Sequence, residues 1–143
     1  MFNRLRRLLR GSRGEAGFSA VEFAIVLPVL MLLILGGMDL AHAYYTQHII
    51  TNASREGARY AVAYTSTNNQ PTSGQISTYV ITALNYNSYN LDNLSVSGSY
   101  TGTSPNKIAT VTVKAKVYWW ILGSFLTNPM QLTAKTAMTV EGP

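Results

Sequence analysis

The stretch that decides the fold is Gly17-Phe18-Ser19-Ala20-Val21-Glu22-Phe23, which continues as an apolar run from Ala24 to Met38. Five arginines precede it, and Asp39 is the first charged residue after the run. As an α-helix, residues 18–38 would be about 31 Å long, which matches the hydrocarbon thickness of a bilayer. The sequence therefore predicts a helix that can cross a membrane once. Pro28 should bend or loosen this helix, because proline lacks an amide donor.

Glu22 is the unusual residue of this stretch. An ionised carboxylate inside an apolar helix is unfavourable by roughly 2.5–3.5 kcal/mol at the centre of a span and by less near its end, and such residues usually serve a function. A structural alternative is an acid that extends to the lipid headgroups. Gly17 has a similar alternative, as a flexible break before a signal anchor.

Gly17, a large apolar residue at Phe18, and Glu22 at the fifth position counted from Phe18 form a pattern that resembles type IV prepilins. The resemblance implies cleavage between Gly17 and Phe18 by a prepilin peptidase at the cytoplasmic face. It also implies that Glu22 neutralises the new terminal amine of an adjoining subunit as the helices bundle. Opposite charges attract strongly in a low-dielectric bundle, and either one alone would be costly to bury.

A second segment narrows the resemblance. Together with the residues above and a short leader, Ala53-Ser54-Arg55-Glu56-Gly57-Ala58-Arg59-Tyr60-Ala61 is similar to the TadE-like proteins, pseudopilins of tight-adherence (Tad) pilus systems. The resemblance extends from Gly17 to about Tyr64. It implies a minor pilin, whose partners are a prepilin peptidase, other pilin and pseudopilin subunits, and the inner-membrane pilus assembly platform. It does not imply N-methylation of Phe18.

The expected organisation has four parts. Residues 1–17 form a basic cytoplasmic leader, 18–38 the transmembrane part of a long helix, 39–64 its extracytoplasmic continuation, and 65–143 the head domain. Most of the net charge of +5 lies in the leader, which by the positive-inside rule stays in the cytoplasm. The head would then lie outside the inner membrane before assembly, and at the cell surface in a pilus after it.

Beyond Asp39 the helical pattern becomes amphipathic. Three- and four-residue steps place one apolar stripe on a single face. Its members are Tyr45, Ile49, Ala53, Gly57, Tyr60, Ala61 and Tyr64. The pattern predicts one long helix from Phe18 to about Tyr64.

The remaining sequence predicts an α+β head. Thr72 and Gln75 have the spacing of a capping box, which predicts a second helix from Ser73 to about Tyr86. Polar loops are expected over 65–71 and 85–93. Period-two alternation predicts strands around residues 94–97, 110–117 and 132–140, with a hairpin turn at 101–106. A sheet with one apolar face would pack as an antiparallel sheet on the two helices, and its strand order stays open.

Trp119-Trp120-Ile121-Leu122-Gly123-Ser124-Phe125-Leu126 is too apolar for an ordinary solvent loop. One interpretation is a flap folded against the long helix or the sheet edge. The other is a contact for a neighbouring subunit or for the membrane interface, where tryptophan is favoured. Trp119, Trp120 and Phe125 are the candidate contact residues.

Residues that carry chemistry are sparse. There is no cysteine, so disulfides and thiol catalysis are excluded. His42 and His48 are not at metal-ligand spacing, and no nucleophile or phosphate-binding motif is present. We therefore expect a non-enzyme with no catalytic residues, no metal and no cofactor. Because the positive charge belongs to the leader, no nucleic-acid partner is expected.

Two other functions remain open. A permanent single-pass envelope protein would keep its leader and bind a partner through the head. Alternatively, Ala41-His42-Ala43 fits a signal-peptidase site. Cleavage after Ala43 would release a soluble adhesin or binding module that starts at Tyr44.

Overall fold

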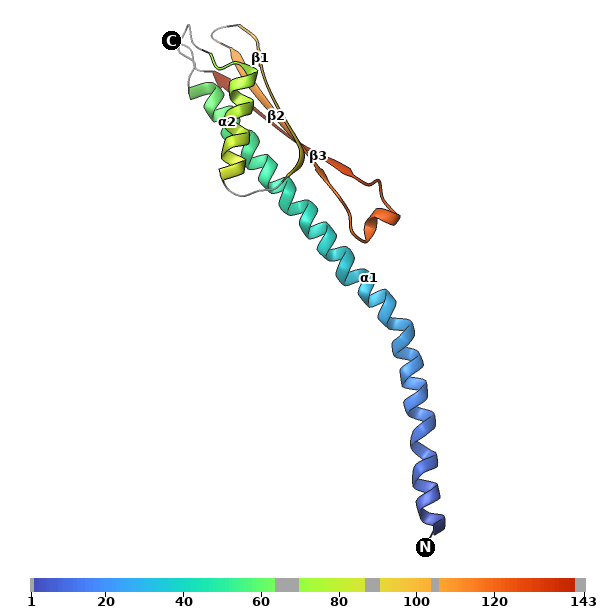
Figure 1. Ribbon diagram of the computed structural model, residues 1–143. Helices are drawn as coiled ribbons and strands as arrows, with labels where there is room; N and C mark the ends of the chain where they lie inside the picture. Colours follow the sequence, from blue (N-terminus) through green and yellow to red (C-terminus); the bar gives the residue numbers. More distant parts are fainter. Residues whose placement is uncertain (1, 64–69, 87–90, 104–105, 141–143) are drawn as a thin grey trace. The chain divides into compact units, whose positions relative to one another are not determined.

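The fold is a long helix followed by a small α+β head. The computed structural model describes residues 2–63, 70–86, 91–103 and 106–140 (Figure 1). The three strands form one antiparallel sheet in the order β1-β2-β3, and the α+β prediction is confirmed. In chain order the elements are α1 (Phe2–Ala63), α2 (Ser73–Tyr86), β1 (Asp92–Thr101), β2 (Lys107–Val117), the 3-10 helix η1 (Leu122–Ser124) and β3 (Met130–Val140).

Some predicted features fall outside the described residues. They are Tyr64 of the apolar stripe, most of the loop over 65–71, part of the loop over 85–93, and the centre of the hairpin turn at 104–105. The chain divides into two compact units, Met1–Met38 and Asp39–Pro143. We call them the N-terminal segment and the head, and α1 contributes to both.

In the N-terminal segment the helix starts at Phe2, whereas the sequence predicted a start at Phe18. Leucine and arginine, which dominate the first ten residues, are good helix formers, and the helix continues through Gly11, Gly14 and Gly17. The helix also continues through Pro28. A proline removes one amide donor, and the neighbouring turns keep their own hydrogen bonds.

In the head, α1 buries two adjacent stripes where the sequence predicted one. Ile49, Ala53, Gly57 and Ala61 of the predicted stripe are buried, but Tyr45 at its start is exposed. The second stripe is formed by Ala43, Thr46, Ile50, Ser54 and Ala58. Two stripes are buried because this part of α1 packs against both the sheet and α2.

Gly57 marks the point where the three elements meet. A Cβ built on Gly57 would lie 2.6 Å from Val80 Cγ2 of α2 and 3.1 Å from Val111 Cγ1 of β2. No side chain fits at that distance without displacing a neighbour. Glycine therefore permits the close packing of α1, α2 and the sheet.

Helix α2 begins with the predicted capping box. The backbone amide of Thr72 donates to Gln75 Oε1 at 2.8 Å, and the amide of Gln75 donates to Thr72 Oγ1 at 3.3 Å. The two side chains satisfy amides that the first turn leaves without partners. Further along, the ring of Tyr79 stacks on Tyr60 of α1 with centroids 4.2 Å apart, so α2 lies beside α1.

Both helices cover the same face of the sheet. A Cβ on Gly98 of β1 would meet Ile76 of α2 at 2.7 Å, and Val111 contacts the site of Gly57 in α1. Gly98 and Val111 are cross-strand partners, so they point to one face. Alternate β2 side chains on this face are buried, namely Ala109, Val111, Val113, Ala115 and Val117. This confirms the predicted alternation.

Candidate functional site

The N-terminal segment presents a continuous apolar surface. Side chains from Phe18 to Leu35 are all exposed. Among the described residues, one part of α1, Gly17–Ala63, is long and apolar enough to cross a membrane by length and composition. Its most apolar 18-residue stretch has a mean hydropathy of 2.5, and none of that stretch is buried. Such a surface is unfavourable in water, because burying apolar area would gain about 25 cal/mol of free energy for each Å². The segment is therefore compatible with membrane anchoring.

Gly17, Phe18 and Glu22 lie together on consecutive turns of this exposed helix. Phe18 is 74% exposed, and a Cβ on Gly17 would meet no atom within 4 Å. Glu22 is exposed, and no described residue gives it a hydrogen bond or an ion pair. Nothing in the described part of the chain therefore compensates the carboxylate if lipid surrounds the helix.

In the head, Asp39 holds the connection between β2 and β3. Its Oδ2 accepts hydrogen bonds from the backbone amides of Ile121 at 2.8 Å and Leu122 at 3.0 Å, and its Oδ1 accepts one from Trp120 at 3.2 Å. The side chain is only 6% exposed. Three amides thus converge on one carboxylate, which is the acceptor that backbone donors bind most strongly.

These contacts also change the acidity of the carboxyl. The amide of Leu122 contributes most to a lowered pKa of Asp39, with further contributions from Ile121 and Trp120, while partial burial opposes the shift. Hydrogen bonds to the charged form favour that form. Asp39 is therefore ionised at neutral pH and remains so well into the acidic range.

The connection from Tyr118 to Pro129 is also held internally. The indole Nε1 of Trp119 donates to the carbonyl of Thr127 at 3.2 Å, and its backbone amide donates to Asn128 Oδ1 at 3.2 Å. Asn128 Nδ2 returns a hydrogen bond to the carbonyl of Trp119 at 3.3 Å. We call residues 118–129 the clamped loop, because Asp39 and Asn128 fix it from two sides.

The three aromatic residues predicted as contacts do not share one environment. Trp119 is buried at 6% exposure, whereas Trp120 is 85% and Phe125 is 75% exposed. Trp119 must therefore be removed from the candidate contact surface, because its ring packs in the core of the head. Trp120 and Phe125 remain candidates. The flap interpretation holds for Trp119, and the surface interpretation stays a prediction for the other two.

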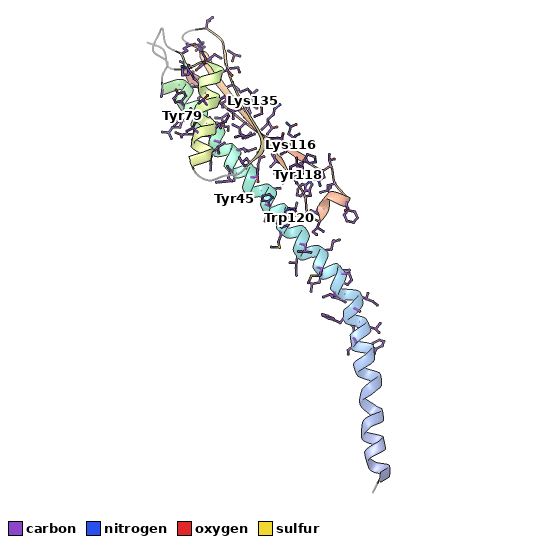
Figure 2. All side chains as sticks on the ribbon, in the orientation of Figure 1. Tyr45, Tyr79, Lys116, Tyr118, Trp120 and Lys135 are labelled. Atoms are coloured by element: carbon purple, nitrogen blue, oxygen red, sulfur yellow. The ribbon has the colours of Figure 1, made fainter. Side chains whose placement is uncertain are left out.

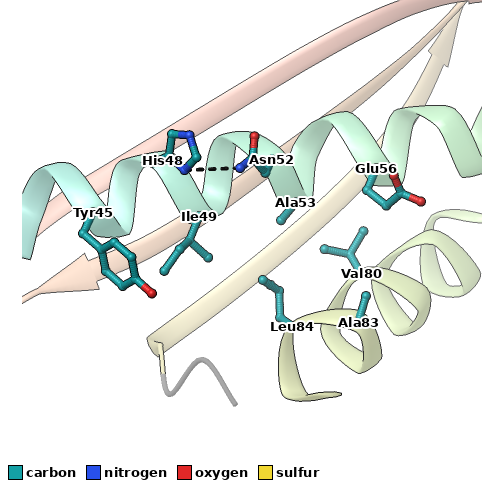
Figure 3. Close-up of a pocket in the computed structure, with 9 residues that line it drawn as sticks. All are labelled: Tyr45, His48, Ile49, Asn52, Ala53, Glu56, Val80, Ala83 and Leu84. Atoms are coloured by element: carbon teal, nitrogen blue, oxygen red, sulfur yellow. Dashed lines mark hydrogen bonds between the residues drawn. The ribbon is translucent and has the colours of Figure 1, made fainter. Parts of the chain in front are cut away.

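A groove of about 460 Å³ separates α1 from α2 (Figure 3). Its base is apolar, with Ile49, Ala53, Val80 and Leu84, and its α1 side carries polar groups. His48 Nδ1 and Asn52 Nδ2 lie 3.2 Å apart on that side, and Glu56 Oε1 accepts a hydrogen bond from the Tyr79 hydroxyl at 3.1 Å. In the described ranges no three His, Asp or Glu side chains gather closely enough to hold a metal ion.

Sequence reasoning missed the part played by Asp39. The spacing of residues in α1 could have indicated it. Steps of four, three and four residues place Asp39 on the same helix face as the buried residues Ala43, Thr46 and Ile50. A buried acid requires donors. The pattern could not indicate that these donors are backbone amides of residues 120–122.

The match to a known family lies within α1. A family model described as TadE-like protein matches residues 17–59. No curated protein and no solved structure matches the chain. The matched range begins at Gly17, contains the apolar run and Asp39, and ends within α1. The sequence of this long helix, from the exposed apolar segment to residues buried in the head, is thus similar to the TadE-like family over residues 17–59.

Proposed function

We propose that this protein is a pseudopilin that a prepilin peptidase cleaves between Gly17 and Phe18 and that is then assembled through α1 into a Tad pilus or its base. The observation that carries the proposal is the start of the TadE-like match at Gly17, immediately before the expected scissile bond. Cleavage there removes the basic leader and leaves Phe18 as the packed terminus. The membrane segment and the head stay joined.

Glu22 then sets the register between subunits. It is exposed and lacks a partner among the described residues, and a buried carboxylate without a partner is strongly destabilising. The free amine of Phe18 on a neighbouring subunit supplies the opposite charge. Pairing of the two charges favours one axial offset between adjacent helices.

The secreted alternative is disfavoured by the packing of the head. Cleavage after Ala43 would remove Asp39, which holds the clamped loop, and would cut α1 beside a buried residue of the core. A single-pass envelope protein that keeps its leader and binds a partner through its head is the remaining alternative.

The N-terminal sequence of the protein purified from its native membrane tests the proposal. We expect a first residue of Phe18. A first residue of Met1 would indicate the permanently anchored form, and Tyr44 the secreted form; either result rejects the proposal.

Gly17→Val supplies a stricter version of the test. A Cβ at Gly17 would meet no atom within 4 Å, so we expect the substitution to leave packing within the described part of this chain intact and its effect to report on the peptidase. We expect Gly17→Val to remain unprocessed. The matched control Gly11→Val, in the same leader, should be processed like the wild type.

A further inference from the structure

The clamped loop exposes apolar side chains without any charge among them. From Tyr118 to Met130 the sequence contains no Asp, Glu, Lys or Arg. Trp120, Phe125 and Leu126 are exposed together with Tyr118 and Met130. These exposed apolar residues lie close together in the sequence, and exposed apolar surface of this kind can mark an interaction site.

The position of the loop in the chain limits what that occupant can be. Through Trp120, Ile121 and Leu122, the loop is hydrogen-bonded to Asp39. Asp39 directly follows the apolar run that ends at Met38. The loop is therefore tied to Asp39, the residue that in sequence directly follows the segment proposed to cross the membrane.

Side chains around Trp120 suit a membrane interface. Leu40 and Tyr44, in the first turns of α1 within the head, are also exposed. A small hollow of about 130 Å³ beside Trp120 is lined by His42, Lys116 and Tyr118, among others. Figure 2 shows Tyr118 and Trp120 toward one end of the head, with Lys116 and Lys135 successively further along the sheet. Tryptophan and tyrosine are enriched at the level of lipid headgroups, and lysine complements the phosphates there.

We propose that Trp120, Phe125 and Leu126 form an interfacial anchor, by which the head rests on the bilayer surface before the subunit enters a filament. Lipid is favoured over a neighbouring subunit because the loop is hydrogen-bonded to Asp39, which directly follows the proposed membrane segment in the sequence, whether or not another subunit is present. The inference deepens the proposed function and rests on the part of it that places residues 18–38 in a membrane. Asp39 acts as the positioning residue, since its carboxylate holds the backbone of the loop.

Quenching of tryptophan fluorescence by brominated lipid tests the anchor on the full chain. The protein is reconstituted in phosphatidylcholine vesicles, with or without bromine on the acyl chains near the headgroups. The chain contains two tryptophans, and Trp120→Phe leaves only the buried Trp119. We expect the brominated lipid to quench most of the emission that Trp120 contributes, and to leave the emission of Trp120→Phe nearly unchanged.

Two further probes, both in the Trp120→Phe background, make the outcome decisive. Leu32→Trp places a probe inside the apolar run and should be strongly quenched by deeply brominated lipid. Thr101→Trp places an exposed probe at the hairpin end of β1, opposite the end of β2 that leads into the clamped loop, and should not be quenched. The pattern of a quenched Trp120, a quenched Leu32→Trp and an unquenched Thr101→Trp supports the anchor.

Other quenching patterns would reject the interfacial anchor, and each would have a different meaning. An unquenched Trp120 with a quenched Leu32→Trp rejects the anchor and leaves the membrane span intact. An unquenched Leu32→Trp rejects both the span and the anchor. Equal quenching of Thr101→Trp and Trp120 rejects a specific role for the loop. If Trp120 is unquenched while Trp120→Ser with Phe125→Ser lowers recovery of the protein in pili, the surface serves a neighbouring subunit instead.

Discussion

The carboxylate of Asp39 accepts a hydrogen bond of 2.8 Å from the backbone amide of Ile121, although the two residues are 82 positions apart in the chain. This contact, with those from Trp120 and Leu122, joins the start of the head to the connection between β2 and β3. One side chain thus ties an apolar loop to the residue that directly follows the apolar run in the sequence.

Asp39→Asn should loosen the clamped loop. Asparagine keeps one acceptor oxygen but replaces the other with an amide nitrogen, which would face the backbone donors. We expect hydrogen exchange at Trp120, Ile121 and Leu122 to accelerate by roughly tenfold, the scale of one lost hydrogen bond to a charged group. The amide of Val113 in β2 is the internal control and should keep its protection. Unchanged exchange at all three loop amides would contradict the assigned role.

The same contacts predict a pH dependence. Because the pKa of Asp39 is lowered in the folded protein, its contribution to stability is complete above the ordinary value of 3.8 and is lost as the pH falls through the lowered pKa. The midpoint of the amide chemical-shift titration of residues 120–122 should therefore lie below that ordinary value. In Asp39→Asn this acidic transition should be absent. A transition centred above 3.8 would refute the lowered pKa.

Gly57→Ala should destabilise the head. The added Cβ would lie 2.6 Å from Val80 Cγ2 and 3.1 Å from Val111 Cγ1, both on stiff β-branched side chains. Overpacking costs about 1–3 kcal/mol, and the better helix propensity of alanine returns up to about 1 kcal/mol. We expect a net loss of about 1–2 kcal/mol in the free energy of unfolding, measured by denaturant titration of the full chain in detergent.

Gly74→Ala is the matched control for that substitution. Gly74 also lies in a helix, but the nearest atom to its added Cβ is Thr72 Oγ1 at 3.9 Å. This variant should be neutral or stabilised by up to about 1 kcal/mol. If both variants lose the same stability, the close packing at Gly57 is not the cause.

Glu22→Gln should separate assembly from folding. The carboxylate has no partner among the described residues, so its neutral isostere should leave the unfolding transition of the isolated chain unchanged. Losing one member of a buried ion pair costs roughly 3–5 kcal/mol, which corresponds to about a hundredfold or more in incorporation into pili. Incorporation is measured by competition with the wild type. Glu56→Gln, the same chemical change in the head, is the control, and equal incorporation of Glu22→Gln and wild type would argue against charge pairing.

Local sequence determined the elements of this protein. The apolar run after Gly17, the capping box of Thr72 and Gln75, and the alternation of β2 all depend on residues within a few positions of one another, so their periodicity is visible without any tertiary contact. The family resemblance belongs to the same category, because it rests on a contiguous stretch of one helix.

Tertiary structure alone decided which of two chemically similar neighbouring residues is buried and which is exposed. Trp119 is buried and Trp120 is exposed although they are adjacent and identical. The second buried stripe of α1 and the role of Asp39 likewise follow from where the sheet and the clamped loop come to lie. Burial and hydrogen bonding are set by groups brought together from distant parts of the chain, and no local pattern records which distant group arrives.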